Sequence, residues 1–296
     1  MKGTFTAIVT PFKNGMIDYQ SFERLINFQI ENGVDGIVPA GTTGESPTLS
    51  HQEHKELITF TVKTVAKRCK IIAGTGANST AETLELTAHA EKTGADAALL
   101  VCPYYNKPTQ EGLLQHYTAV ADSCSIPLVL YDVPGRCGIE IKAQTIAKLA
   151  KHKNIKAVKD ATGSLDKTSE ILFLTQGSGF SVISGNDSVT VPLISVGGSG
   201  IISVVSNILP KETKTLTDAA LAGNFEKARE LHLKLWPLFT GMFVQTNPIP
   251  VKAACYLAGL IDTPEYRLPL CAMESGLIKV LQETMRSAGI TIKNPV

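Results

Sequence analysis

Lys159 is the residue of this sequence whose setting most clearly favours chemistry. Residues 155–159 (Ile-Lys-Ala-Val-Lys) form an apolar run that ends in a lysine, and Asp-Ala-Thr-Gly follows, which is typical of a buried parallel strand ending in a turn. Burial disfavours an ammonium group, so the pKa of such a lysine falls and its free amine can attack carbonyl carbons. The structural alternative is a lysine at a strand end whose amine extends to water.

A Schiff-base reaction on a small keto acid needs further groups, and the sequence offers them directly after other predicted strands. Tyr131 ends the strand before the one that carries Lys159 and could move protons, with a threonine hydroxyl as a link. The backbone amides of residues 41–44 (Gly-Thr-Thr-Gly) could bind a carboxylate, because glycine permits close approach. Arg136 could bind a second carboxylate with two parallel hydrogen bonds.

Each of these motifs also has a purely structural interpretation. Gly-Thr-Thr-Gly is a common tight turn, Tyr104 and Tyr105 could pack at a rim or an interface, and Arg136 could be a solvated loop charge. His51 and His54 lie three residues apart, but His-Gln-Glu-His matches neither zinc-protease pattern, so we expect no metal site. The functional interpretation is favoured because the signals follow strands that would end on one face of one fold.

The elements that would position these residues alternate along the first 223 residues. The expected strands are residues 5–9, 36–39, 70–74, 97–101, 128–131, 155–159, 180–184 and 200–203. The expected helices are residues 19–32, 51–67, 79–93, 109–123, 142–151, 165–175, 188–196 and 210–222. Parallel strands need such crossovers, and eight units over about 220 residues predict an α/β fold, a closed (β/α)8 TIM barrel. A doubly wound open sheet is the alternative, but no Gly-x-Gly-x-x-Gly follows the first strand.

Two helix starts carry capping-box sequences. Ser50 with Glu53, and Ser79 with Glu82, predict the starts of the second and third helices.

The alternation of strands and helices ends after residue 223. The later helical patterns, residues 224–244, 250–259 and 273–288, have no strand between them, and Trp236-Pro237 predicts a kink or break in the first. We expect a catalytic barrel domain of residues 1–223 and a C-terminal α-helical domain of residues 224–296 that serves packing or oligomer contacts.

Composition excludes several classes of function. The chain has 296 residues, 44% of them hydrophobic and 19% charged, with a net charge of +1, so we expect neither nucleic acid nor a membrane surface as a partner. No apolar run could cross a bilayer, and the start lacks the apolar core of a signal peptide. Six cysteines without a Cys-x-x-Cys pair fit reduced thiols, so a cytoplasmic location is expected.

Four motifs resemble signatures of the dihydrodipicolinate synthase family, within the Schiff-base-forming pyruvate aldolase/lyase superfamily. They are Gly-Thr-Thr-Gly-Glu (41–45), Pro-Tyr-Tyr-Asn-Lys-Pro (103–108), Tyr-Asp-Val-Pro-Gly-Arg-Cys-Gly (131–138) and Val-Lys-Asp-Ala-Thr-Gly (158–163). The resemblance extends over essentially the whole chain, including Ser-Gly-Asn-Asp (184–187) and Gly-Ile-Ile-Ser-Val (200–204). It implies a barrel with a helical C-terminal domain, a homotetramer built as a dimer of dimers, no cofactor, and condensation of pyruvate with L-aspartate-4-semialdehyde to 4-hydroxy-tetrahydrodipicolinate on the way to lysine.

The resemblance also implies roles for individual residues. Lys159 would form the Schiff base with pyruvate. The implied proton relay consists of Tyr131, Thr42 and Tyr105, the last reaching across from a neighbouring subunit. The implied substrate-binding residues are Thr43 for the pyruvate carboxylate, Arg136 for the semialdehyde carboxylate, and Gly185 and Ile202 lining the site.

Lysine-sensitive members of this family carry a feedback site at the tight-dimer interface, and the residue types here match it. The matching residues are Ser46, His51, His54, Asn78, Glu82 and Tyr104. Glu82 suits an ammonium group, and Asn78 and Tyr104 suit a carboxylate. We therefore expect inhibition by L-lysine, with Pro47 standing where relatives commonly have alanine.

Two alternatives stay open at this point. N-acetylneuraminate lyase and 2-keto-3-deoxy sugar acid aldolases use the same lysine and tyrosine on pyruvate, although the threonine pair and Arg136 favour the synthase. The chain could instead be a non-catalytic barrel that binds a keto acid. Lys159, Tyr131 and Thr42 together speak against such a binder, because a binding module needs no proton relay.

Overall fold

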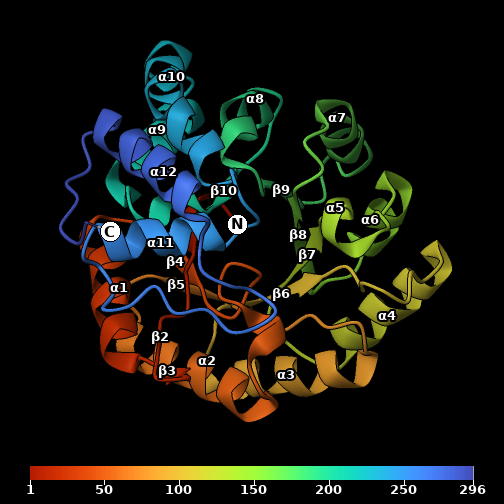
Figure 1. The fold of residues 1–296 in the computed structure, drawn as a ribbon. Helices are drawn as coiled ribbons and strands as arrows, with labels where there is room; N and C mark the ends of the chain where they lie inside the picture. Colours follow the sequence, from red (N-terminus) through yellow and green to blue (C-terminus); the bar gives the residue numbers. More distant parts are fainter. Residues whose placement is uncertain (296) are drawn as a thin grey trace.

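The computed structural model describes residues 1–295 and shows a closed barrel of eight parallel strands (Figure 1). The order around the barrel is β1-β10-β9-β8-β7-β6-β5-β4. The barrel strands are β1 (Gly3–Ala7), β4 (Gly36–Val38), β5 (Lys70–Gly74), β6 (Ala97–Val101), β7 (Leu128–Asp132), β8 (Ile155–Asp160), β9 (Ser181–Ser184) and β10 (Gly200–Ser203). The predicted barrel is confirmed, and every predicted barrel strand is present with bounds that differ by at most two residues.

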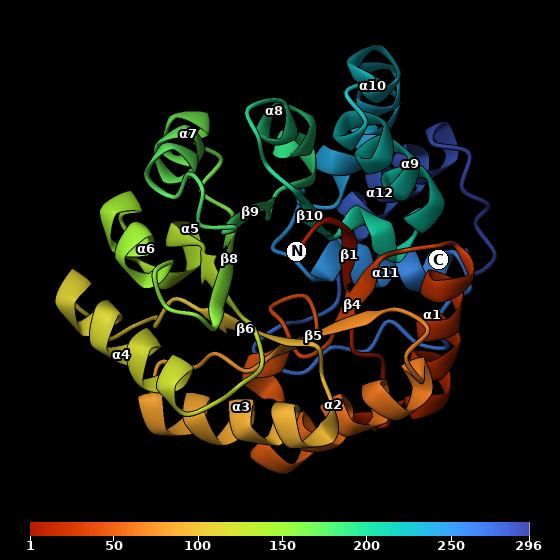
Figure 2. The same ribbon diagram turned by 180° about the vertical axis from the view of Figure 1, so that it is seen from behind.

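A ring of helices surrounds the barrel in both views (Figures 1 and 2). These helices are α1 (Tyr19–Glu31), α2 (His51–Val65), α3 (Thr80–Thr93), α4 (Gln110–Asp122), α6 (Ala143–Leu149), α7 (Leu165–Leu174), α8 (Thr190–Ser195) and α9 (Pro210–Leu221). The helix expected from residue 188 begins instead with a 3₁₀ turn, η2 (Asp187–Val189), that leads into α8. Strands and helices therefore alternate as the sequence predicts, and the loops that follow the strands meet at one end of the barrel.

Of the two predicted capping boxes, one forms. At the start of α2, the Ser50 hydroxyl accepts a hydrogen bond from the Glu53 backbone amide at 3.2 Å, and the Glu53 carboxylate accepts one from the Ser50 amide at 2.9 Å. The prediction at Ser79 is wrong, because its side chain makes no capping bond to α3. Glu82, the expected partner of Ser79, lies 3.3 Å from the His51 ring nitrogen instead.

Several short elements were not predicted. They are the hairpin of β2 (Phe12–Lys13) and β3 (Met16–Ile17), the 3₁₀ turns η1 (Ser46–Thr48) and η3 (Val205–Asn207), and the one-turn helix α5 (Pro134–Cys137). Each is too short to show the periodicity of a helix or a strand. Two of them matter for the site, because η1 follows the Gly-Thr-Thr-Gly turn and α5 carries Arg136.

Three helices complete the chain: α10 (Phe225–Gly241), α11 (Ile249–Leu257) and α12 (Ser275–Ser287). The prediction at Pro237 is a kink or a break. No break occurs there, because α10 continues through Pro237. Pro237 lies on the exposed face of α10, where water can bond the carbonyl group that proline leaves without a donor.

The C-terminal helices share a core with the barrel. One apolar cluster contains Ile8 and Phe12 after β1, helix α1 residues such as Phe22, and Leu257 and Met285 of α11 and α12. In both views α10 stands beside α8 and α9 (Figures 1 and 2). Among residues 1–295 no helix has both the length and the hydropathy that a bilayer crossing requires.

Candidate active site

Lys159 lies near the carboxyl end of β8 and is buried. Its side chain is only 6% exposed, so the alternative of an amine that extends to water is wrong. Tyr131 of β7 is its neighbour in the strand register, and adjacent residues of paired strands point to the same side of the sheet. The Lys159 Nζ atom lies 4.0 Å from the centre of the Tyr131 ring.

Burial changes the acid–base behaviour of both side chains. It lowers the pKa of Lys159 from 10.5 to about 7; the carboxylate of Asp187 opposes this shift, and Arg136 adds to it. Much of the amine is therefore uncharged near neutral pH, as a nucleophile must be. Burial raises the pKa of Tyr131, which the Arg136 charge and the nearby Thr42 hydroxyl partly offset. Its phenol therefore keeps its proton and can donate it.

Asp187 is a buried carboxylate to which the sequence analysis assigned no role. It accepts hydrogen bonds from the Ser203 hydroxyl at 2.5 Å and the Val204 amide at 3.0 Å, which fix it beside the barrel end of β10. Its charge favours the ammonium form of Lys159. Its place in Ser-Gly-Asn-Asp, directly after a strand, is the signal that could have identified it.

The Gly-Thr-Thr-Gly turn follows β4 and presents Thr43 from a buried position. The Gly44 and Glu45 amides donate to the carbonyls of Gly41 and Thr42, both at 3.1 Å, which closes the turn. The Thr43 hydroxyl oxygen accepts a hydrogen bond from the Asn247 side-chain amide at 3.0 Å. Because that oxygen is already an acceptor, the hydroxyl proton is free to point at a ligand oxygen.

The other predicted substrate-binding residues sit around this centre. Arg136 is exposed on α5, and its guanidinium donates to the Asn247 backbone carbonyl at 3.0 Å. Ile202 is fully buried on β10. Gly185 donates its amide to the Asp160 carbonyl at 2.7 Å, and a Cβ atom there would lie 2.7 Å from the Ala161 Cβ, so only glycine fits.

Tyr105 differs from the other predicted catalytic residues. Its side chain is 90% exposed, and its backbone adopts φ 71°, a left-handed conformation that is costly for a residue with a side chain. It lines neither of the two cavities that border Thr42. Within one chain it therefore projects outward from the loop after β6.

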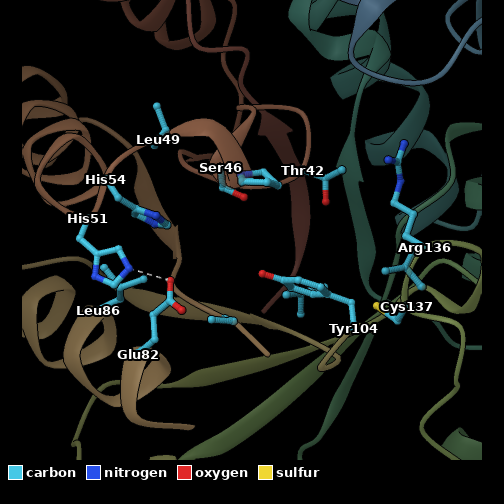
Figure 3. Close-up of a pocket in the computed structure, with 15 residues that line it drawn as sticks. Thr42, Ser46, Leu49, His51, His54, Glu82, Leu86, Tyr104, Arg136 and Cys137 are labelled. Carbon is cyan, nitrogen blue, oxygen red and sulfur yellow. Dashed lines mark ion pairs between the residues drawn. The ribbon is translucent and has the colours of Figure 1, made fainter. Parts of the chain in front are cut away.

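A cavity of about 530 Å³ opens beside this centre and brings the two predicted sites together (Figure 3). Its wall includes Thr42, Arg136 and Tyr104, whose hydroxyl points into the open space. It also includes five of the six residues expected to bind lysine, namely Ser46, His51, His54, Glu82 and Tyr104. The sixth, Asn78, does not line the cavity; its backbone carbonyl accepts a bond from the Asn106 side chain at 2.9 Å.

The far side of this cavity is polar. His51 and Glu82 lie 3.3 Å apart and face the open space from α2 and α3 (Figure 3). The His54 Nε2 atom lies 2.6 Å from the Gly74 carbonyl, and burial lowers the pKa of His54, so the ring is neutral and donates that bond. A hollow of about 30 Å³ between Thr42 and Tyr131 adjoins the cavity, and Lys159 lines neither space.

The C-terminal region contributes to this site, which corrects the expectation that it serves only packing or oligomer contacts. Asn247 precedes α11 and contacts both Thr43 and Arg136. Lys252 of α11 places its Nζ atom 2.6 Å from the Glu45 carboxylate directly after the turn. Beyond α11, the Thr263 hydroxyl and the Arg267 guanidinium donate to carbonyls of Phe12 and Thr48. A lysine inside the apolar stretch Pro-Ile-Pro-Val-Lys-Ala-Ala was the available signal.

Among residues 1–295 no group of three or more His, Cys, Asp and Glu side chains is arranged to hold a metal ion. What the structure assembles is a buried amine, a neutral phenol, paired hydroxyls and a guanidinium at the carboxyl end of a (β/α)8 barrel. This arrangement is typical of the class of barrel enzymes that use a lysine amine as a nucleophile towards carbonyl substrates.

Comparison with known proteins identifies the group within that class. The model of the Dihydrodipicolinate synthetase family matches residues 1–288, so the chain belongs to this family. The 4-hydroxy-tetrahydrodipicolinate synthase of Hydrogenobaculum sp. (strain Y04AAS1) is 53% identical over 287 residues, covering 97% of this chain and 98% of the relative.

Two solved structures bear on ligands. The chloride-inhibited dihydrodipicolinate synthase of Acinetobacter baumannii, complexed with pyruvate, superposes with a TM-score of 0.95 at 45% identity, over 98% of this chain and 99% of that one. The enzyme of Cyanidioschyzon merolae with lysine bound gives 0.93 at 41% identity, over 98% of both chains.

Proposed function

We propose that this chain condenses pyruvate with L-aspartate-4-semialdehyde to 4-hydroxy-tetrahydrodipicolinate through a Schiff base on Lys159, in lysine and diaminopimelate biosynthesis. The observation that carries the proposal is the buried Lys159 amine, with a pKa of about 7 and its Nζ atom 4.0 Å from the Tyr131 ring centre. The family and its 53% identical relative, which is a 4-hydroxy-tetrahydrodipicolinate synthase, support it. The chain is thus a lyase of this family.

The chemistry follows from the groups present. The Lys159 amine attacks the pyruvate ketone, and a proton passes from nitrogen to oxygen to give a carbinolamine, which loses water to form the Schiff base. Loss of a methyl proton then gives an enamine, whose carbon attacks the aldehyde of the second substrate. The amino group of that substrate then attacks the regenerated Schiff-base carbon, which closes the ring and releases the Lys159 amine. Each step moves a proton, and Tyr131 with Thr42 is the proposed carrier, since burial keeps the Tyr131 phenol protonated and Thr42 lines the same small hollow.

The two substrate carboxylates have separate proposed partners. Thr43 binds the pyruvate carboxylate, because Asn247 already donates to its oxygen and leaves the hydroxyl proton free. Arg136 binds the semialdehyde carboxylate, because it is exposed at the cavity wall and, within the described residues, is anchored at only one nitrogen. Gly185 and Ile202 line the pyruvate end.

We propose that the working molecule is a homotetramer, a dimer of dimers, in which Tyr105 enters the neighbouring subunit's relay. The 90% exposed side chain and the strained backbone of Tyr105 support this, because strained residues cluster at functional sites. We further propose residues 1–223 as the catalytic domain, residues 224–296 as the helical domain, and a cytoplasmic location.

We propose L-lysine as an inhibitor that binds in the 530 Å³ cavity. Glu82 would bind its side-chain or α-ammonium group, and Tyr104 its carboxylate, with Ser46, His51 and His54 completing the wall and Asn78 contributing from the adjoining loop. The cavity also reaches Thr42 and Arg136, so a ligand there would lie against the substrate groups. The lysine-bound relative supports this choice of ligand.

Borohydride reduction in the presence of pyruvate tests the central proposal. We expect one reduced pyruvate unit on the peptide that carries Lys159, and no label in Lys159→Ala. An unlabelled wild-type protein would favour the keto-acid binder instead. Feeding L-aspartate-4-semialdehyde, N-acetylmannosamine and sugar aldehydes to the pyruvate-loaded protein then separates the synthase from N-acetylneuraminate lyase and the sugar acid aldolases, because only the accepted aldehyde consumes pyruvate.

A further inference from the structure

We propose that Lys252 is a positioning residue for the carboxylate-binding turn of residues 41–44, and that it acts through Glu45. The inference rests on the proposed function, because it assigns Lys252 a role in holding Thr42 and Thr43 for substrate. Lys252 does not itself reach the reacting groups. It belongs to α11, in the region expected to serve packing or oligomer contacts.

The pair between Lys252 and Glu45 is sealed inside the protein. The Nζ atom lies 2.6 Å from the Glu45 Oε1 atom, and both side chains are 0% exposed. The ring of Phe12 covers the ammonium group at 4.1 Å, and the ring of Tyr266 lies 5.3 Å away. With water excluded, each charge depends on the other for compensation, so the geometry of the pair is stringent.

Glu45 needs such a restraint, because its backbone is strained. Its φ angle is 56°, and Ala40, just before the turn, has a φ angle of 53°. Residues with a Cβ atom adopt this left-handed region only where their surroundings impose it. Both Glu45 carboxylate oxygens are held from the C-terminal region, one by Lys252 and the other by the Arg267 backbone amide at 3.4 Å.

The backbone transmits this restraint to the threonines. The Glu45 amide donates to the Thr42 carbonyl at 3.1 Å, and the Glu45 carbonyl accepts from the Thr48 amide at 3.0 Å. Glu45 thus joins the turn to η1. Movement of its side chain would shift the Thr42 carbonyl and rotate the Thr43 hydroxyl away from its bond with Asn247.

A purely structural pair is the competing explanation. Apolar residues of similar volume often stabilise a core as well as a buried ion pair does, so burial alone does not explain the charges. A positioning role explains the charges, because a hydrogen-bonded ion pair fixes one geometry, whereas packed apolar groups tolerate several. The two explanations differ in what happens when both charges are removed together.

Three variants test this difference: Lys252→Met, Glu45→Gln, and the double variant Glu45→Gln/Lys252→Met. Each single variant leaves one buried charge without its partner, so we expect a lower Tm and a KM for pyruvate raised about tenfold. The double variant leaves no unpaired charge at this site, so its Tm should recover. It also lacks the restraint on Glu45, so its KM for pyruvate should stay raised. If the double variant recovers both Tm and KM, or if Lys252→Met lowers Tm alone, the proposal is overturned.

Leu281→Ala is the matched control for loss of stability alone. Leu281 is fully buried on α12, in the apolar cluster that also contains Phe12, and is not part of the cavity wall. We expect it to lower Tm while the KM for pyruvate stays at the wild-type value at temperatures where it is folded. A KM raised as much as in Lys252→Met would mean that any destabilisation opens the turn, and would refute the specific role of Lys252.

Failure of this inference can be distinguished from failure of the proposed function. If wild-type protein gives no borohydride label at Lys159 with pyruvate, the proposed function is wrong. If wild-type protein is labelled and the double variant is labelled with the same half-saturating pyruvate concentration, only the positioning role is wrong. Should Lys252→Met not fold, the double variant carries the test by itself.

Discussion

The protonation of Lys159 leads to a quantitative prediction for Schiff-base formation. Burial places the pKa of Lys159 at about 7 instead of 10.5. The fraction of free amine then rises from about one-tenth at pH 6 to about nine-tenths at pH 8, and hardly changes above that. An amine of ordinary pKa would instead gain about tenfold in each pH unit up to pH 10.

Reductive trapping of the Schiff base between pyruvate and Lys159, with cyanoborohydride as the reductant, can measure this difference. We expect the initial rate of labelling at subsaturating pyruvate to rise about tenfold between pH 6 and 8 and then to level off. Cyanoborohydride at a fixed, saturating concentration keeps reduction from limiting the rate, and a free lysine analogue measured in parallel corrects for the reagent. A labelling rate that keeps rising tenfold per unit to pH 10 would contradict the buried, deprotonated amine inferred from the structure.

Three further predictions concern single side chains. Lys159→Met should abolish labelling yet raise stability to urea by about 2–5 kcal/mol at pH 7. The folded-state pKa of Lys159 lies below the unfolded-state value, so the cost of burying its ammonium is full below about pH 7 and vanishes above pH 10.5. The stability gained by Lys159→Met should follow the same pH dependence. Thr43→Val should raise the KM for pyruvate, measured by steady-state kinetics, about ten- to a hundredfold. The reason is that a donor to the carboxylate is lost and the Asn247 amide loses its acceptor. Lys159 should still be labelled at high pyruvate concentration. Glu82→Gln should raise the lysine concentration for half-inhibition about tenfold or more, because the carboxylate proposed for the ammonium group is gone; an unchanged inhibition curve would place lysine elsewhere.

The barrel could be predicted from the sequence because its signals are local. Most barrel strands contain a short apolar run, and each is followed by a helical pattern, so the alternation appears without knowledge of any contact. The position of Lys159 follows from the same rule, because strand ends in a barrel gather at one face. The wrong prediction at Ser79 shows the limit of such signals. The capping sequence is present there, but Glu82 turns to His51 on the neighbouring helix instead.

The contribution of the C-terminal region could not be predicted, because it depends on distant contacts. Asn247 meets Thr43 across 204 positions of sequence, and Lys252 meets Glu45 across 207. No periodicity or motif spacing connects residues so far apart, and only the folded chain brings them together. The Arg136 guanidinium is similar, because its anchor is the backbone carbonyl of Asn247, which has no sequence signature at all.

Lys159 and Lys252 show why residue type alone does not reveal a role. Both are buried, and burial lowers the pKa of each, to about 7 for Lys159 and about 8 for Lys252. Lys252 has Glu45 at 2.6 Å, so near neutral pH it remains mostly an ammonium bound in an ion pair. The Lys159 amine makes no hydrogen bond within residues 1–295; it lies 4.0 Å from the centre of the Tyr131 ring and feels the charge of Asp187, but no bonded carboxylate holds its proton. A lysine that must attack a carbonyl needs an unengaged amine, whereas a lysine that must fix a strained turn needs a permanent partner. The same desolvation therefore supports nucleophilic chemistry at one lysine and rigid positioning at the other, and the presence or absence of a bonded carboxylate decides which.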